Sequence, residues 1–190
     1  MNDWDASRFD SIPAQWLGGD EPNVLGPGEP RRAVGCRILQ ADPRNWFPPG
    51  ASVDADMARA CQAGLLLRHD CLEESHTISQ SIASTTGSYW HGIMHRREPD
   101  FSNAKYWFRK VGRHPVFERL ATEAARLAAA HECRLARQIA GWNRWDPFAF
   151  VDACEAALDD PKQGADLCRA IALAEWRLLF EYSWQSATAT

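Results

Sequence analysis

Three of the six histidines lie close together in the segment HTISQSIASTTGSYWHGIMHRRE, which begins at His76. Imidazole nitrogens are ligands for Zn, Fe, Mn and Ni, and imidazole also exchanges protons near neutral pH. His91 and His95 are four residues apart and Glu98 follows three residues later, so a helix places them on one face. Glu73 and His76 have the Glu-x-x-His spacing of a second helical pair. The segment therefore predicts a polar site between two helices.

The first of these helices is expected to run from Asp54 to about Ala83, where STTGS interrupts the helical pattern. On a helical wheel, one polar stripe lies between Leu65 and Leu66. The stripe consists of His69, Glu73, His76 and Gln80. Buried charges and imidazoles need partners, and a turn at STTGS would fold the second helix back against the stripe. The candidate cluster is Glu73, His76, Gln80, His91, His95 and Glu98.

Three interpretations of this cluster are open. The first is a metal site, and the lack of a second Glu-x-x-His disfavours a ferritin-like di-iron centre and favours one ion. The second is metal-free acid–base chemistry, in which a histidine paired with Glu98 or Asp100 titrates near neutral pH. The third is a hydrogen-bond network that only locks the helices in register. The metal interpretation takes one divalent ion (Zn, Fe, Mn or Ni) with Glu73, His76, His91 and His95 as ligands.

Catalytic and substrate-binding roles follow from the same region. The catalytic candidates are His76, His91, His95 and Glu98. The segment NAKYWFRK comes directly afterwards, and Lys or Tyr side chains beside imidazoles can bind an anionic substrate. The substrate-binding candidates are Gln80, Lys105, Tyr106 and Trp107. The structural alternative for the last three is an exposed lysine and two aromatic residues of the core.

Other catalytic motifs are missing or incomplete. His69-Asp70 has the dipeptide of HD-type phosphohydrolases, but no earlier metal-binding histidine precedes it, and the wheel places Asp70 on the solvated face. The serines lack a GxSxG context, and the chain has no P-loop, GxGxxG or HExxH.

Composition argues against nucleic acid and membrane partners. The net charge is −4 over 190 residues, and basic residues form only isolated pairs. No apolar run is long enough to cross a bilayer, and the amino terminus, MNDWDASRFD, lacks the apolar region of a signal peptide. The six cysteines show no CxxC pair. We therefore expect a cytoplasmic protein with reduced cysteines, whose partner is a small-molecule ligand.

The chain divides into two unequal parts. Residues 1–52 hold most of the eleven prolines and predict an arm with sparse regular structure, tied to the body by its aromatic side chains. Residues 53–190 predict a helical domain, with further helices at about 88–97, 100–112, 115–140, 146–158 and 165–184. No strand pattern appears. The expected fold is all-α, a single-domain bundle of about five to six helices.

The segments SHTISQ, GSYWHGIMHRREPDFSNAKYWFRKVG and HPVF together resemble a group of uncharacterised proteins that carry very similar segments. The resemblance spans about Leu65 to Phe117. It implies that the cluster region is the shared signature of the group, and it implies no activity. His69 lies outside the shared segments, which leaves His76, His91 and His95 as the histidines of the site.

Two hypotheses of function follow. The leading one is an enzyme that acts on a small molecule through the His/Glu site, with or without a metal ion. The competing one is a non-catalytic ligand-binding or protein-binding module in which the polar network is structural and the Trp-rich arm contributes the surface. The sequence decides neither between enzyme and module nor the oligomeric state.

Overall fold

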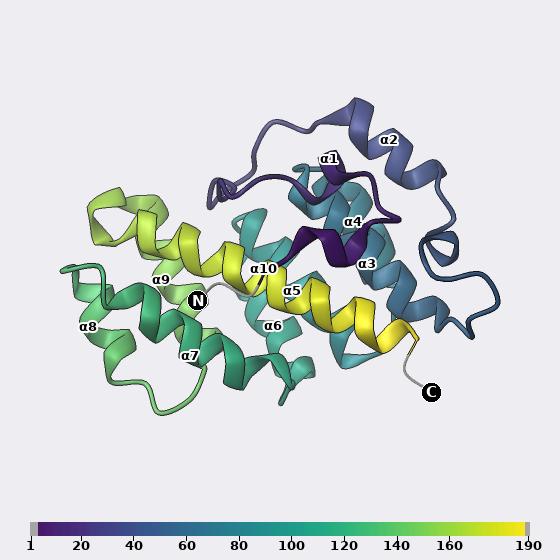
Figure 1. Cartoon of the computed structure of the whole chain (residues 1–190). Coiled ribbons are helices and arrows are strands. Elements are labelled where there is room, and N and C mark those ends of the chain that lie inside the picture. The colour runs from purple at the N-terminus through teal and green to yellow at the C-terminus, as the bar shows by residue number, and fades with distance from the viewer. Residues whose placement is uncertain (1–3, 189–190) are drawn as a thin grey trace.

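Helices make up all the regular structure of residues 4–188, the part of the chain that the computed structural model describes (Figure 1). This part contains ten α-helices: α1 (Ala14–Leu17), α2 (Arg32–Gln40), α3 (Ala55–Arg68), α4 (Leu72–Ser79), α5 (Thr85–Arg97), α6 (Phe101–Val111), α7 (Val116–Ala128), α8 (Arg134–Ala140), α9 (Pro147–Asp159) and α10 (Ala165–Ala187). Three 3₁₀ helices accompany them: η1 (Ala6–Phe9), η2 (Pro43–Trp46) and η3 (Pro161–Gln163). The all-α prediction is confirmed, whereas the prediction of five to six helices is wrong.

A break in the first predicted helix accounts for part of the difference. Helix α3 ends at Arg68 and α4 begins at Leu72. Between them Asp70 has a φ of 58°, a left-handed conformation that Asp adopts more readily than most residues. Its carboxylate accepts a hydrogen bond from Asn23 Nδ2 (3.0 Å) and pairs with Arg97. Asp70 is therefore a partly buried junction, and the prediction that it lies on the solvated face is wrong.

The remaining helices come from a second break and from the arm. The helix predicted for residues 115–140 is interrupted between α7 and α8 by a turn in which His131 donates its N–H to the Ala128 carbonyl (3.0 Å). Neither Gly nor Pro stands in this turn, so the local pattern gave no stop signal. The arm contributes α1 and α2, both of which pack against α3.

Helix α5 lies at the centre of the fold and packs against α3, α4 and α6. Its Tyr89 and Trp90 side chains are fully buried. A Cβ atom at Gly64 would lie 2.8 Å from the Trp90 ring, so the glycine lets α3 and α5 approach closely. The Trp90 indole donates a hydrogen bond to Ser183 Oγ (3.2 Å), which ties α5 to α10.

Helix α10, the long yellow helix of Figure 1, crosses the molecule and packs against α3 and α7. Aromatic residues of the arm also pack against α10. Phe9 packs edge-on against Phe180 at 5.2 Å between ring centroids, and Phe47 lies 4.4 Å from Trp184. Arg177 of α10 also pairs with Asp20 of the arm. The arm is thus tied to the helical body by aromatic contacts and an ion pair.

Two further sequence predictions concern membrane spans and cysteines. Within residues 4–188, no helix combines the length and the apolar character needed to cross a membrane. All six cysteines are free thiols. Four of them are buried, Cys133 is partly buried and Cys36 is exposed.

Candidate metal centre

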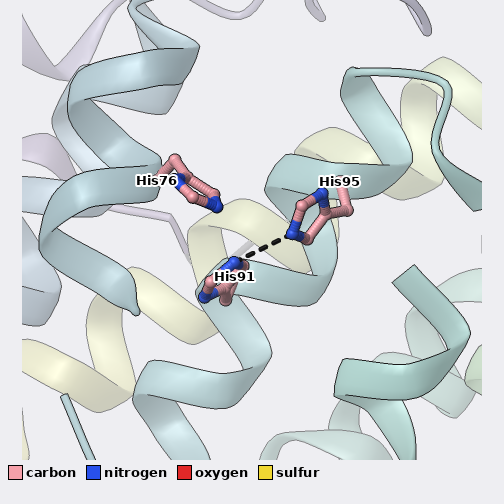
Figure 2. A group of neighbouring side chains, drawn as sticks. All are labelled: His76, His91 and His95. Carbon is pink, nitrogen blue, oxygen red and sulfur yellow. Dashed lines mark hydrogen bonds between the residues drawn. The ribbon is translucent and has the colours of Figure 1, made fainter. Parts of the chain in front are cut away.

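Three histidines from two helices meet at one point. His76 comes from α4, and His91 and His95 come from successive turns of α5. Each imidazole offers one nitrogen, and these three nitrogens all lie within 4.8 Å of one another. Figure 2 shows the His76 ring pointing toward the other two rings. We call these three residues the histidine triad.

The turn between α4 and α5 brings the triad together. Ser84 caps α5, because its hydroxyl accepts a hydrogen bond from the Gly87 N–H (3.2 Å). A side chain at Gly87 would clash with the Ile82 carbonyl, so glycine permits the tight reversal. Ser75 donates a hydrogen bond to the Ala63 carbonyl (2.9 Å), which holds α4 against α3. This reversal lays α5 beside α4, with His76 facing His91.

Hydrogen bonds define the tautomer of His95. Its Nδ1 lies 3.0 Å from a carboxylate oxygen of Glu98, and because a carboxylate only accepts, Nδ1 carries the proton. The lone pair of His95 therefore sits on Nε2, where it faces His91 Nε2 at 2.9 Å and Asn103 Nδ2 at 3.2 Å. A histidine held by a carboxylate at one nitrogen, with the other nitrogen turned inward, is the usual arrangement of a metal ligand.

His91 is oriented by stacking rather than by a carboxylate. Its ring lies parallel to the Trp107 indole, at 3.9 Å between centroids and 15° between planes. Its Nδ1 is buried and has no hydrogen-bond partner among residues 4–188. The ammonium of Lys110 lies 4.3 Å from the Trp107 ring centroid, within cation–π range.

Burial keeps the two α5 histidines neutral. Loss of solvent lowers the pKa of His91 to about 3, and the neighbouring His95 and His76 act in the same direction. Burial also lowers the pKa of His95, although the hydrogen bond from its Nδ1 to Glu98 acts in the opposite direction. Neutral imidazole is the form that binds metal ions, so both residues are ready to act as ligands at neutral pH.

The other predicted site residues lie outside the triad. In the described part of the chain, the group of potential ligands does not include Glu73, which is exposed in the first turn of α4. Gln80 is exposed at the end of α4. Lys105 pairs with Asp152 of α9, and Tyr106 is 45% exposed.

His69 also stands apart from the triad. It is buried, and its Nε2 lies 2.9 Å from the Trp16 carbonyl of the arm. The helical wheel placed His69 beside His76 because the wheel assumed one continuous helix. The chain instead turns at Asp70.

Asn103 and Lys110 lie near the triad and were not among the site residues predicted from the sequence. Lys110 lies three residues after Trp107 and therefore on the same face of α6, a spacing that could have indicated it. The sequence instead favoured Lys105 as the cation of the site, because Lys105 directly follows the cluster.

The three histidines differ in their exposure to solvent. His76 is only partly buried, and the Glu98 side chain is 54% exposed, whereas His91 and His95 are buried. Three imidazoles provide three of the four positions of a tetrahedral ion and leave the fourth for water or a ligand.

Comparison of the chain with family models, curated proteins and solved structures finds no match. The likeness to a group of uncharacterised proteins therefore stays a prediction.

Proposed function

We propose that the protein binds one divalent transition-metal ion through His76, His91 and His95 and uses it to act on a small molecule. The observation that carries this proposal is the convergence of three imidazole nitrogens, from two helices, within 4.8 Å of one another. Nitrogens bound to one tetrahedral zinc ion lie roughly 3.3 Å apart, because each is about 2.0 Å from the metal.

Zinc is the ion that this donor set favours. Three neutral imidazoles and an open position form the ligand set of hydrolytic and hydrating zinc enzymes. In such a site the ion lowers the pKa of its bound water to about 7 and supplies a hydroxide nucleophile at neutral pH. Glu98 orients His95 and increases its basicity, as carboxylates do for zinc-binding histidines. We infer hydrolysis or hydration as the reaction class.

A metal-free role is the second candidate. The observation that favours it is the 2.9 Å hydrogen bond between His91 and His95, which continues to Glu98. Such a chain can connect helices without a ligand, and the protein would then be a binding module. This network leaves the buried Nδ1 of His91 without a hydrogen-bond partner among residues 4–188.

Elemental analysis tests the proposal. The protein is purified without a chelator or a metal-affinity tag, and wild type is compared with the His91→Ala/His95→Ala double variant. We expect one equivalent of zinc in wild type and none in the double variant. A His131→Ala variant is the control, because His131 lies in the turn after α7, outside the triad. Metal-free wild type after zinc addition and dialysis would refute the proposal and favour the module.

A further inference from the structure

We propose that the metal site binds an oxyanion, the carboxylate or phosphate group of a small substrate, and that Asn103 is the hydrogen-bond donor that recognises it. This inference rests on the proposed metal site and adds the chemical class of its substrate. It starts from the position of the Asn103 amide, 3.2 Å from the nitrogen that His95 would give to the metal.

Two donors compete for one lone pair in the triad. His95 Nε2 has a single lone pair, and both Asn103 Nδ2 and His91 Nε2 face it. A metal ion on His95 Nε2 takes this lone pair, so the Asn103 amide loses its acceptor. The amide nitrogen is then left within about 5 Å of the ion, because zinc lies about 2.0 Å from its nitrogen ligands. An oxygen bound to the ion lies within reach of this N–H donor.

Asn103 is held firmly in this position. It lies in the first turn of α6, where its backbone N–H donates to a carboxylate oxygen of Asp100 (3.1 Å). The side chain is partly buried, and helix α6 packs closely along α5. The cap fixes the backbone from which the Asn103 side chain projects, so the amide needs little reorganisation to stabilise charge on a metal-bound oxygen.

The charges around the triad favour an anion. The ammonium of Lys110, above Trp107, adds to the charge of a bound dication, and Lys110 is exposed to solvent. Two acidic residues oppose this charge. Glu98 bonds to His95, and Asp100 is occupied by the cap of α6, where the hydrogen bond from the Asn103 backbone lowers its pKa. With a dication bound, the positive charges outnumber the negative ones, and an oxyanion neutralises the difference.

The test uses cobalt(II), whose visible absorption reports its ligands. Cobalt-loaded protein is titrated with inorganic phosphate and separately with acetate, in wild type and in Asn103→Ala. We expect at least one anion to change the cobalt spectrum, and Asn103→Ala to weaken that binding about tenfold or more, as for the loss of a hydrogen bond to a charged group. Cobalt affinity itself should stay the same or rise, since Asn103 competes with the metal for His95.

Matched variants distinguish loss of anion recognition from a nonspecific effect of substitution on the fold. Ser102→Ala, one residue earlier in α6 and exposed, should bind the anion like wild type. Lys110→Ala should weaken anion binding a few-fold at low salt, whereas Lys162→Ala, at an exposed lysine of η3, should not. Tighter binding of phosphate than of acetate would assign the substrate to phosphate compounds, and the reverse order would assign it to carboxylates.

Two outcomes overturn separate claims. If wild type takes up no cobalt, the proposed metal site fails. If cobalt binds but neither anion changes its spectrum, or if Asn103→Ala binds the anion as well as Ser102→Ala does, the metal site stands and the oxyanion inference is wrong.

Discussion

Helix α5 has two polar surfaces that differ in where their partners lie in the chain. The core face, Tyr89, Trp90 and Arg96, bonds to residues of α10 that are 79 to 93 positions away. The histidine face, His91, His95 and Glu98, bonds mainly within itself and to Asn103, over separations of only three to eight positions. The core face joins distant helices, whereas these bonds of the histidine face stay within α5 and the start of α6.

The two faces of α5 are expected to contribute differently to stability and to ligand binding. Glu175 of α10 lies against the core face and is fully buried. It accepts a hydrogen bond from Tyr89 (3.0 Å) and pairs with Arg96. The Arg96 guanidinium also lies 4.6 Å from the centroid of the Phe150 ring. Removing one member leaves a buried charge without its partner. The His91 and His95 imidazoles are neutral, and the Glu98 carboxylate that pairs with His95 is exposed to solvent, so a substitution on this face leaves no buried charge without a partner. Substitutions on the core face are therefore expected to lower the free energy of unfolding strongly. Substitutions on the histidine face are expected to change ligand binding instead.

The largest effect is expected for Glu175→Gln. The free energy of unfolding should fall by about 3–5 kcal/mol, because the Arg96 charge stays buried without a carboxylate. Urea denaturation measures the change. Glu155→Gln, on the exposed side of α9, is the control and should change stability little. The double variant Arg96→Met/Glu175→Met should recover most of the loss, and a loss below about 1 kcal/mol in Glu175→Gln would contradict the assignment.

A pH effect is expected at His114, which contacts the first turn of α5. Its Nδ1 accepts the Val116 N–H (3.3 Å), so Nε2 carries the proton and donates to Thr86 Oγ1 (3.2 Å). Burial lowers the pKa of His114 to about 4. The unfolded chain binds this proton at higher pH than the native protein, so stability falls as the pH drops from about 6.5 to about 4, by about 3 kcal/mol in total.

His114→Asn isolates this contribution. The Asn carbonyl can accept the Val116 N–H, so the fold should persist with a smaller loss of stability on acidification than wild type. Buried His69 and His91 titrate in the same direction and remain in both proteins, so the difference between the two pH profiles is the quantity to measure. Parallel profiles would show that His114 does not contribute.

Zinc is expected to stabilise the protein through the histidine face. At a free zinc concentration 100 times the dissociation constant, the gain is about 2.7 kcal/mol, because only the native state holds the assembled triad. Thermal unfolding with and without zinc measures it. The His91→Ala/His95→Ala variant should show no gain and His131→Ala the full gain. Equal gains in all three proteins would place the zinc elsewhere.

The smallest effect is expected for Glu98→Gln. The amide oxygen can still accept the His95 Nδ1 proton but lacks the charge, so zinc affinity should fall about tenfold. Stability without metal should change little, because the Glu98 side chain is 54% exposed. Competition with a chromophoric chelator measures the affinity. Glu73→Gln is the matched control, and a comparable loss there would restore Glu73 as a ligand.

Much of the histidine face could be predicted from the sequence. The separations between His91, His95 and Glu98 are multiples of about one helical turn, so any helix through them aligns the three side chains. The all-α class followed in the same way from helical periodicity and from capping residues. Asp100 and Asp146, for example, cap α6 and α9, and Asp is one of the residue types most favoured at that position. These features depend on residues close together in the chain.

The triad and the core face depend on contacts between helices, and only the tertiary structure decided them. The turn at Asp70 reflects its bonds to Asn23 and Arg97, so α4 has a different orientation from the continuous helix of the wheel. That change brings His76 to the α5 histidines and sends His69 to the arm. Helical spacing specifies which side chains share one face of a helix. The pairing of helix faces in the folded protein depends on packing energies summed over the whole chain.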